Sequence, residues 1–315
     1  MTSVRTPQVW LPIAPEEVEG LPAGLEYVYW NAGEQFPADP ADCVFYVAPY
    51  MQQAPVKVQP LPLMSGLRVI QTLTAGVDQF LPALARLHPG VRLCNARGVH
   101  EASTAEMALA LVLASLRGIP QFVRRQDRHE WSSGFHPSLA DRTVAIVGYG
   151  AIGSAVEDRL AGFECARVLR FARSPRETER GPVHAVADLP RLLPQADVVV
   201  VVTPLTPQTK GLVDAAFLAR MKDGALLVNV GRGPVVDTGA LLAELGTGRL
   251  RAALDVTDPE PLPPGHPLWD APGVLISPHV GGPTSAFLPR AKRLLADQLQ
   301  RFAADRPLRH VVAES

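Results

Sequence analysis

The sequence predicts an α/β protein built on doubly wound, mostly parallel sheets, and three observations lead to this fold class. Short apolar, β-branched runs recur along the chain, with helical stretches between several of them. One of these runs leads directly into the glycine-rich segment at residues 148–153. At 315 residues, 47% hydrophobic and 19% charged, the chain is long enough for about two domains of roughly 100–200 residues, each with its own core.

The first hundred residues contain the first set of apolar runs. These runs are predicted to be strands, at residues 9–12, 25–30, 43–47, 69–73 and 91–95. Helical stretches separate several of them. Residues 101–117 differ, because strong helix formers there are apolar on nearly every face, which predicts a helix buried on most sides. A polar, arginine-rich helix is expected at about residues 121–130.

A second set of strands begins at residues 143–147, a β-branched run typical of a strand buried on both faces. Further strands are expected at residues 166–171, 197–202, 225–230, 252–256 and 274–276. The first unit lacks the elements to close by itself, and the amphipathic helix at 285–305 has no place in the second sheet. We therefore expect a discontinuous first domain, 1–98 with 286–315, and a second domain at 99–285.

The composition limits the possible partners. A formal net charge of −1 gives no overall attraction to nucleic acid or to an anionic membrane. The scattered Cys43, Cys94 and Cys165 fit neither a metal site nor a disulfide framework, which suits a reducing compartment. Because no apolar run approaches the ~20 residues of a membrane span and the N-terminus resembles no signal peptide, we expect a cytoplasmic protein without metal, membrane or nucleic-acid partners.

The glycine-rich segment has the properties of a phosphate cradle for a dinucleotide, because it follows a buried strand and precedes a good helix. Gly148 permits the tight turn, and Gly150 lets the backbone approach a pyrophosphate. Gly153 lets the helix and the strand pack closely. The N-terminus of the helix faces the negative charge, so Ala151 and Ile152 complete the expected cofactor contacts in this segment.

The end of the next strand predicts which dinucleotide is bound. An Asp or Glu that holds the ribose 2′-hydroxyl is usual there, but Ala172 takes its place, followed by Arg173 and Ser174. A missing carboxylate removes repulsion of a 2′-phosphate, and a guanidinium supplies a bidentate partner for it. We therefore expect these three residues to bind NADP(H) in preference to NAD(H), which stays possible.

Three side chains follow strand ends of the second unit and have the chemistry needed to reduce a 2-keto acid. Arg232, between two glycines, can reach a carboxylate and the neighbouring keto oxygen. His279 suits the acid that protonates this oxygen near neutral pH as hydride arrives at carbon. Glu260 is the natural carboxylate partner that favours imidazolium and fixes the ring. Ligands bind at the carboxyl edge of such sheets, so these residues are the predicted catalytic set.

Taken together, these motifs resemble the D-isomer-specific 2-hydroxyacid dehydrogenase family. The segments GYGAIG, NVGRGPVVD, ALDVTDPEPLP and SPHVGG each match a family signature, in order and in approximate spacing. The resemblance implies that Arg232 orients and polarises the substrate, that His279 is the acid/base and that Glu260 tunes it. It also implies a Rossmann-type nucleotide domain, a split, flavodoxin-like substrate domain, a cleft between them and usually a homodimer formed through the nucleotide-binding domains.

The resemblance implies further binding residues. The amides of Ala75 and Gly76 resemble the family's grip on the substrate carboxylate, which Arg232 shares. Asp255 resembles the residue that holds the nicotinamide carboxamide, and Thr104 one that lies near the nicotinamide. The remaining expected cofactor contacts are Thr203 and Pro204, beside the adenosine ribose and phosphates, and Val230, Gly231, Gly281 and His279.

Arg173 beside Ser174 resembles the NADPH-preferring glyoxylate and hydroxypyruvate reductases of the family, and the chain has no room for the regulatory domain of some phosphoglycerate members. We therefore expect a D-stereospecific oxidoreductase that moves a hydride between NADP(H) and C2 of a small 2-keto or 2-hydroxy acid, such as glyoxylate or hydroxypyruvate. Candidates for the pocket that receives the substrate side chain are Tyr46, Tyr50, Met51 and Trp269, although apolar residues there could equally belong to the core.

Three alternatives stay open. One is a dinucleotide-sensing, corepressor-like module without turnover, which would not need Arg232, Glu260 and His279 together, although such relatives keep them. Another is a D-3-phosphoglycerate-type dehydrogenase that uses NAD. The third is formate or phosphite oxidation on the same scaffold, but for formate the resemblance predicts glutamine instead of Glu260 and a longer N-terminal region.

Overall fold

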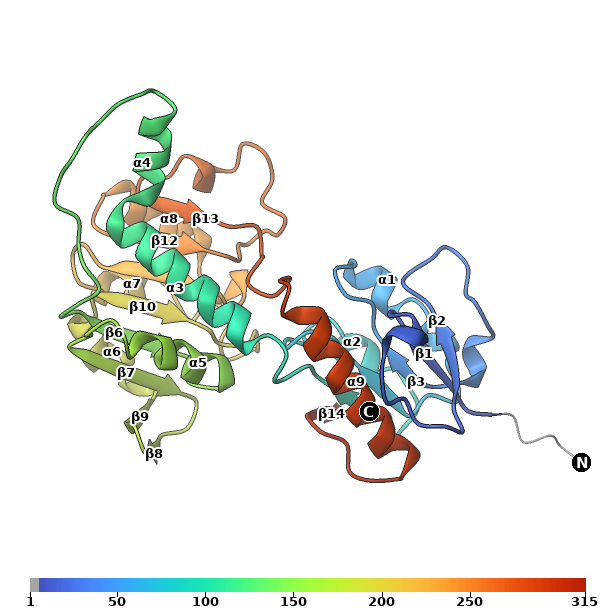
Figure 1. Ribbon diagram of the computed structural model, residues 1–315. Coiled ribbons are helices and arrows are strands. Elements are labelled where there is room, and N and C mark those ends of the chain that lie inside the picture. Colours follow the sequence, from blue (N-terminus) through green and yellow to red (C-terminus); the bar gives the residue numbers. More distant parts are fainter. Residues whose placement is uncertain (1–5) are drawn as a thin grey trace, which may run out of the picture. The chain divides into compact units, whose positions relative to one another are not determined.

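The computed structural model describes residues 6–315, which form two compact units (Figure 1). Unit 1 consists of the chain up to His100 together with Ser285–Ser315, and unit 2 is Glu101–Thr284. Each unit is built around its own, mostly parallel sheet, so the predicted fold class is confirmed. That unit 1 binds the substrate and unit 2 the dinucleotide stays a prediction.

The sheet of unit 1 has the order β14-β5-β4-β3-β1-β2. Its strands are β1 (Gln8–Leu11), β2 (Glu26–Tyr29), β3 (Cys43–Val47), β4 (Val69–Gln71), β5 (Arg92–Cys94) and β14 (Val311–Glu314). Neighbouring strands are parallel except β14 and β5. From β2 to β5 this is the strand order 2-1-3-4-5 of flavodoxin-like sheets.

Helices cover both faces of the unit 1 sheet. They are α1 (Ala54–Val58), α2 (Leu81–Leu84) and α9 (Phe287–Ala303). Because side chains alternate along a strand, Val9 and Leu11 of β1 share one core with Leu295 and Leu299 of α9, whereas Trp10 belongs to the core on the other face. The tail of the chain thus completes the core of unit 1.

A buried pair of amides also joins the tail to this sheet. Gln298 of α9 donates from Nε2 to Oε1 of Gln71 in β4 at 2.7 Å, and both side chains are fully buried. The Gln298 side chain also accepts from the amide of Arg309 and donates to its carbonyl, which fixes the segment that leads into β14. Since each amide finds partners, the network avoids the free-energy cost of unpaired buried polar groups.

The eight-stranded sheet of unit 2 has the order β13-β12-β11-β10-β6-β7-β9-β8. Its strands are β6 (Thr143–Val147), β7 (Arg167–Ala172), β8 (Arg176–Thr178), β9 (Gly181–Ala185), β10 (Val198–Val201), β11 (Leu226–Asn229), β12 (Arg251–Leu254) and β13 (Val274–Ile276). All neighbours are parallel except β8 and β9. Apart from β8 and the added edge strand β13, the order is that of a Rossmann fold, and it reverses between β6 and β10.

Helices lie on both faces of this sheet as well (Figure 1). Val144 and Ile146 of β6 point to the face covered by α3 (Glu101–Arg117) and α5 (Ala151–Leu160). Ala145 and Val147 point to the opposite core, formed with α6 (Leu189–Leu192), α7 (Ala215–Arg220) and α8 (Thr238–Gly246). Burial on both faces explains why these strands are continuous apolar runs instead of alternating ones.

The helix α4 (Ile119–Gln126) starts two residues earlier than predicted. Gly118, with φ 72°, ends α3, and Pro120 occupies the first turn of the next helix, where its missing amide proton costs no hydrogen bond. Within residues 6–315 no single helix has the length and hydropathy expected of a membrane span. The helices α3 and α4 have that length and hydropathy only when they are taken together, and a bend of 67° separates them.

The sequence patterns missed β8, β9 and β14. The first is three residues long and polar, and β14 pairs antiparallel with a strand more than two hundred residues away in the chain. Short 3₁₀ helices complete the structure at Pro15–Glu17, Pro40–Asp42, Leu61–Leu63, Val186–Asp188, Leu193–Gln195, Gly233–Val235 and Pro267–Trp269.

Candidate active site

Most of the predicted site residues lie at one edge of the unit 2 sheet. The strands β13, β12, β11, β10 and β6 are adjacent and parallel, so their carboxyl ends meet there. The residues that follow these ends are His279, Asp255, Arg232, Thr203 and Gly148, respectively. Ala75 and Gly76 lie in unit 1, after β4. The Rossmann topology therefore brings the predicted cradle and catalytic side chains to a single edge.

The glycine-rich turn is tied to the neighbouring strand. Gly148 has φ 109°, and its amide and that of Tyr149 both donate to the carbonyl of Phe171 in β7, at 2.9 and 2.7 Å. The first regular helical bond of α5 runs from the Ser154 amide to the Gly150 carbonyl. The earlier amides of α5 thus lie at a helix N-terminus, the arrangement that binds phosphate groups.

The residues around the cradle fit a dinucleotide. A Cβ at Gly148 would lie 2.7 Å from the Val202 carbonyl carbon, and one at Gly153 would lie 2.5 Å from the Gly148 carbonyl oxygen. Because glycine has no Cβ, the turn can lie this close to both β10 and α5. Beside the turn, the hydroxyl of Thr203 is buried and has no hydrogen-bond partner among residues 6–315. Such an orphaned group is expected where a ligand supplies the partner.

Arg232 is held by the turn that follows β11. The side-chain oxygen of Asn229 accepts from the Gly231 amide at 3.0 Å, and its nitrogen donates to the Arg232 carbonyl at 3.0 Å. The guanidinium donates to the Gly231 carbonyl at 2.8 Å and is half-buried. Asn229 is fully buried, so it sets the backbone from which Arg232 extends.

His279 and Glu260 form the pair that the sequence predicts. Nδ1 of the imidazole lies 2.6 Å from Oε1 of Glu260, and a little under half of each side chain is exposed. With the carboxylate as acceptor, Nδ1 carries a proton and the ring orientation is fixed. The other ring nitrogen, Nε2, is then available to exchange a proton with a ligand.

Asp255 organises the loop that carries His279. Its Oδ1 accepts from the Ser277 hydroxyl at 2.6 Å and the Val280 amide at 2.9 Å, and its Oδ2 accepts from the Gly281 amide at 2.9 Å. Its carbonyl accepts from the His279 amide at 2.8 Å, where the backbone is left-handed with φ 55°. The nicotinamide contact expected of Asp255 stays a prediction, but the carboxylate already has this structural task.

The start of α3 contacts the same loop. Thr104 is buried and donates from its hydroxyl to the Gly281 carbonyl at 3.4 Å. The Ser277 hydroxyl lies 3.9 Å from the sulfur of Met107, one helical turn further along α3. Neither Ser277 nor Met107 was singled out from the sequence; the position of Ser277 at a strand end, next to that of Asp255, is the signal that could have found it.

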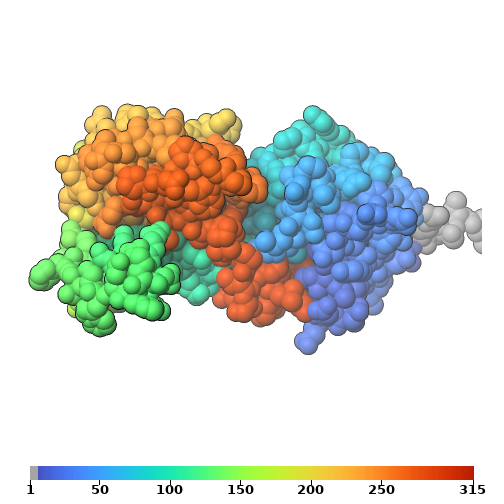
Figure 2. All heavy atoms as spheres, turned by 90° about the horizontal axis from the view of Figure 1, so that it is seen from above, coloured from blue at the N-terminus to red at the C-terminus, as the bar shows by residue number. Residues whose placement is uncertain are grey.

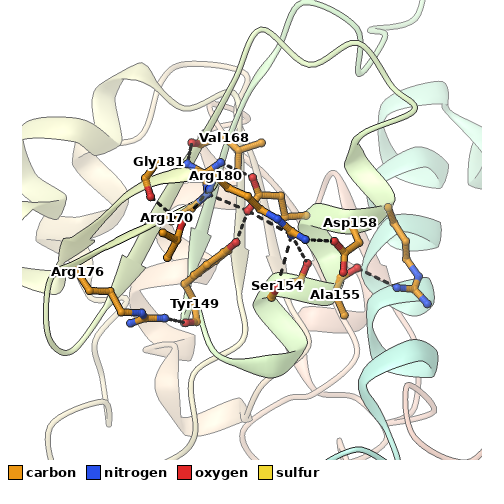
Figure 3. A network of polar contacts seen from close by, with 12 residues as sticks. Tyr149, Ser154, Ala155, Asp158, Val168, Arg170, Arg176, Arg180 and Gly181 are labelled. Atoms are coloured by element: carbon orange, nitrogen blue, oxygen red, sulfur yellow. Dashed lines mark hydrogen bonds and ion pairs between the residues drawn. The ribbon is translucent and has the colours of Figure 1, made fainter.

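The residues predicted to bind the 2′-phosphate lie at the end of β7, which neighbours β6 on the side away from β10. Ala172 ends β7, and Arg173 and Ser174 are exposed in the turn that leads to β8. A further arginine, Arg176, lies at the start of β8 and was not predicted from the sequence. Its Nη2 donates to the Tyr149 carbonyl, inside the glycine-rich turn, at 2.6 Å (Figure 3). A guanidinium therefore lies directly beside the predicted phosphate cradle.

In unit 1, the loop after β4 has its carbonyl oxygens occupied. The Ala75 carbonyl accepts from the Asn95 side chain at 2.9 Å, and the Gly76 carbonyl accepts from the Thr74 hydroxyl at 2.7 Å. Neither the Ala75 nor the Gly76 amide has an acceptor in the described part of the chain. Two neighbouring donors of this kind suit a carboxylate.

The candidates for the substrate pocket separate into two groups. For Tyr46 the core alternative is correct and the pocket role is excluded, because it is fully buried in the core of unit 1 and donates to the Lys57 carbonyl at 2.8 Å. Tyr50 stacks on Phe287, with ring centroids 4.0 Å apart. Met51 and Trp269 are exposed, so both keep surface that a ligand can contact.

Comparisons with known proteins agree with this geometry. A family model described as the NAD binding domain of D-isomer specific 2-hydroxyacid dehydrogenases matches residues 109–281. A glyoxylate reductase/hydroxypyruvate reductase from Mus musculus is 39% identical over 230 residues, which are 70% of this chain and 69% of that protein. A glyoxylate reductase from Aeropyrum pernix is 35% identical over 75% of this chain and 73% of its own length.

Solved structures extend the similarity to nearly the whole chain. A D-isomer specific 2-hydroxyacid dehydrogenase family protein from Aeromonas salmonicida has a TM-score of 0.85 at 29% identity, covering 98% of this chain and 99% of that one. An NADPH-dependent glyoxylate/hydroxypyruvate reductase from Sinorhizobium meliloti, in complex with NADP and sulfate, has a TM-score of 0.80 at 29% identity, covering 98% of both. The chain therefore belongs to the D-isomer specific 2-hydroxyacid dehydrogenase family and is an NAD(P)-dependent oxidoreductase.

Proposed function

We propose that this enzyme reduces a small, unphosphorylated 2-keto acid such as glyoxylate or hydroxypyruvate to the D-2-hydroxy acid, with NADPH as the preferred reductant. The pairing of His279 with Glu260 at 2.6 Å, at the same sheet edge as Arg232 and the glycine cradle, is the observation that supports this most directly. Relatives named as glyoxylate and hydroxypyruvate reductases support the substrate class.

In the proposed mechanism the chain's own residues handle the charge and the proton. Arg232 binds the substrate carboxylate and counters the negative charge that develops on the C2 oxygen. His279 donates the proton on Nε2 to this oxygen, while Glu260 holds Nδ1 and keeps the ring oriented. The bound nicotinamide supplies the hydride that adds to C2. In the oxidative direction His279 accepts the proton instead.

The cofactor and substrate contacts are proposed for the residues that the sequence analysis identified. The turn from Gly148 to Gly153 holds the pyrophosphate at the N-terminus of α5. The buried, orphaned hydroxyl of Thr203 supports a ligand beside Pro204, and Val230 and Gly231 follow the adjacent strand β11. The amides of Ala75 and Gly76 in unit 1 bind the substrate carboxylate. The nicotinamide contacts are proposed for Thr104, Asp255, His279 and Gly281.

A preference for the phosphorylated dinucleotide rests on Ala172, Arg173 and Ser174 at the end of β7. No carboxylate there repels a 2′-phosphate, and Arg173 is an exposed guanidinium without a carboxylate partner within residues 6–315. The NADP bound to the Sinorhizobium meliloti reductase supports the same preference. We expect NAD(H) to be used less efficiently.

We also propose that the enzyme acts in the cytoplasm as a homodimer. Cys43, Cys94 and Cys165 are free thiols, which fits a reducing compartment. The segment from α4 to residue 137, green in Figure 2, is rich in exposed apolar side chains, including the fully exposed Trp131 and Phe135. Apolar surface of this kind marks a site of protein association, and a two-fold dimer is the most common solution.

The test of the function is NADPH oxidation across a panel of 2-keto acids by the wild type and by His279→Ala and Arg232→Ala. We expect the wild type to prefer glyoxylate or hydroxypyruvate, and each variant to lose about 10²–10⁴-fold in kcat/KM. Both variants should still bind NADPH, measured by cofactor fluorescence, because the phosphate cradle is intact in both and His279→Ala removes only one of the proposed nicotinamide contacts.

Matched controls separate chemistry from folding. His88 and Arg220 are exposed residues of the same types, away from the proposed site, so His88→Ala and Arg220→Ala should keep wild-type turnover. Near-normal turnover by His279→Ala would show that the mechanism is wrong. NADPH binding by the wild type without turnover of any acid in the panel would instead favour the dinucleotide-sensing alternative.

A further inference from the structure

The glycine-rich turn is connected to a buried ionic network that the proposed reaction does not use. Glu157 on α5 and Arg170 on β7 form an ion pair in which both side chains are about one-tenth exposed. Arg170 donates to both carboxylate oxygens of Glu157, with Nε at 2.8 Å from Oε2. Buried ion pairs of this kind hold their elements in a defined geometry, because removing either partner leaves an uncompensated charge.

Tyr149, the second residue of the glycine-rich turn, is anchored to this pair. Its hydroxyl donates to Oε2 of Glu157 at 2.5 Å, and the residue is 5% exposed. Burial alone raises the pKa of Glu157, but the hydrogen bonds from Arg170 and Tyr149 outweigh it and hold that pKa below its usual value. Glu157 is therefore a permanent acceptor near neutral pH, and the Tyr149 ring is fixed against α5.

Arg176 is attached to the network through Tyr149. Its Nη2 donates to the Tyr149 carbonyl at 2.6 Å, and its Cζ lies 5.9 Å from the centroid of the Tyr149 ring (Figure 3). The Cζ of Arg170 lies 5.8 Å from the same centroid. One tyrosine thus fixes the position of Arg176 by a hydrogen bond and by a cation–π contact.

The arginines near the turn differ in how their charges are compensated. Arg170 is paired with Glu157, and Arg180, on the turn between β8 and β9, is paired with Asp158. Arg176 has no carboxylate partner in the described part of the chain, and its side chain is exposed. A guanidinium has five N–H donors, so the single bond to Tyr149 leaves most of them available.

We propose that Arg176 is a second residue that binds the 2′-phosphate of the dinucleotide, and that Tyr149, anchored by the Glu157–Arg170 pair, is its positioning residue. The proposal rests on the NADP(H) preference proposed above. Arg176 lies against the turn expected to hold the pyrophosphate, on the side of β7 and the exposed Arg173. A pre-positioned guanidinium binds a phosphate dianion with less loss of side-chain entropy than a mobile one.

The test measures binding of adenosine 2′,5′-bisphosphate and of AMP to the full chain, because these two probes differ only in the 2′-phosphate. We expect the wild type to bind the bisphosphate more tightly. Arg176→Gln should reduce this selectivity about 10- to 100-fold while leaving AMP binding unchanged. Arg180→Gln removes the same charge from the same hairpin. Arg180 is paired with the exposed Asp158 and lies only 3.9 Å from Glu157 at the margin of the network, so we expect less than about 3-fold change.

Tyr149→Phe tests the positioning role, because it removes only the hydroxyl that binds Glu157. We expect a loss of selectivity of about 3- to 10-fold, with the KM for NADPH raised and kcat kept, and with NADH kinetics unchanged. A purely structural role would instead lower thermal stability and weaken both probes equally. Glu157→Gln should act like Tyr149→Phe, but Tyr149→Phe decides the question if Glu157→Gln does not fold.

The outcomes separate this inference from the proposed function. If the wild type selects the bisphosphate and Arg176→Gln selects it equally well, the role of Arg176 is wrong and the NADP(H) preference stands. If Arg176→Gln loses selectivity but Tyr149→Phe does not, the positioning role of Tyr149 is wrong. If the wild type shows no selectivity, both the cofactor preference and this inference fail.

Discussion

At the scale of single residues, the Thr203 hydroxyl has opposite effects on the stability of the fold and on ligand binding. The hydroxyl is buried without a partner among residues 6–315, at the point where β10 meets the glycine-rich turn. A buried unsatisfied hydroxyl costs about 1–3 kcal/mol of folding free energy. The fold accepts this loss at the edge where a ligand is expected, which is typical of a binding site.

We predict that Thr203→Val raises the free energy of unfolding of the cofactor-free protein by up to about 1–3 kcal/mol, because valine has nearly the same shape and no unpaired group. The same substitution should weaken NADPH binding, so that the rise in melting temperature on adding NADPH becomes smaller. Urea unfolding and thermal shift measure the two effects. Thr206→Val is the control, since the Thr206 hydroxyl accepts from the Thr209 amide, and its loss should destabilise. A destabilised Thr203→Val protein would contradict the prediction.

Other residues show where sequence reasoning stops. His279, Glu260 and Arg232 could be found because each stands in a local segment with strong context. Arg176 could not, because its significance depends on a bond to the Tyr149 carbonyl, 27 positions away in the chain. The loop contacts of Asp255 are equally non-local, since they join two neighbouring strand ends. Side-chain roles of this kind depend on register between elements, which single-sequence patterns do not contain.

At the scale of elements, Asp197 joins the amino ends of two strands in unit 2. Its Oδ2 accepts from the Thr143 amide at the start of β6, and its Oδ1 lies 2.8 Å from Nζ of Lys222. Burial alone raises the pKa of this carboxyl, but the bonds from Lys222 and Thr143 outweigh it and hold the pKa below its ordinary value. Protonation of Asp197 therefore opposes folding.

The sign of the resulting pH dependence follows from linkage. Because the folded-state pKa is lower than the unfolded one, the contribution of Asp197 to stability is fully present above the ordinary carboxyl pKa and is lost as pH falls through the folded value. We predict that Asp197→Asn destabilises by about 1–3 kcal/mol at pH 7 and that the difference from wild type shrinks below about pH 5. Urea unfolding at a series of pH values measures this.

A surface aspartate supplies the comparison. Asp223 lies near Arg249, but most of its side chain is exposed, so Asp223→Asn should change stability little at any pH. A constant difference between Asp197→Asn and wild type from pH 7 to pH 3.5 would show that the carboxylate charge is not the cause.

The elements that the sequence predicted share a physical property. Buried parallel strands such as β6 are continuous apolar runs, and the predicted bounds of β6 equal those of the structure. The hairpin of β8 and β9 sits at the edge of the sheet, where half-exposed, polar residues suffice, so no apolar run marks it. Short, polar strands such as β8 are thus hard to find from hydrophobic periodicity, whereas the apolar edge strand β13 was predicted.

At the scale of the whole molecule, unit 1 is assembled from both ends of the chain. α9 supplies Leu294, Leu295, Leu299 and Phe302 to its core, and Gln298 binds Gln71 of β4. An amphipathic helix at the end of the chain is visible in the sequence, but its partner strands are not. That this helix covers the sheet of unit 1 can be inferred from the sequence only because the first hundred residues lack the elements to form a closed domain by themselves.

The dimer is the prediction that concerns the molecule as a whole. The segment from α4 to residue 137 exposes Ile119 and Val123, one helical turn apart, and the fully exposed Trp131 and Phe135. Single exposed apolar residues are common, but a group of them on one segment is typical of an association surface. If this segment forms the contact across a two-fold axis, each of its residues lies in the interface once from each protomer. Truncating one side chain by mutation therefore removes two side chains from the interface of the dimer.

We predict that the wild type has about twice the mass of a single chain in light scattering coupled to size exclusion, and that Trp131→Ala with Phe135→Ala shifts it to the monomer at micromolar concentration. Removing two large aromatic side chains from each protomer forfeits several kcal/mol of association free energy. Leu63→Ala is the control, because Leu63 is an exposed apolar residue of unit 1, outside this segment. A monomeric wild type, or a double variant that stays dimeric, would show that this segment does not hold two chains together.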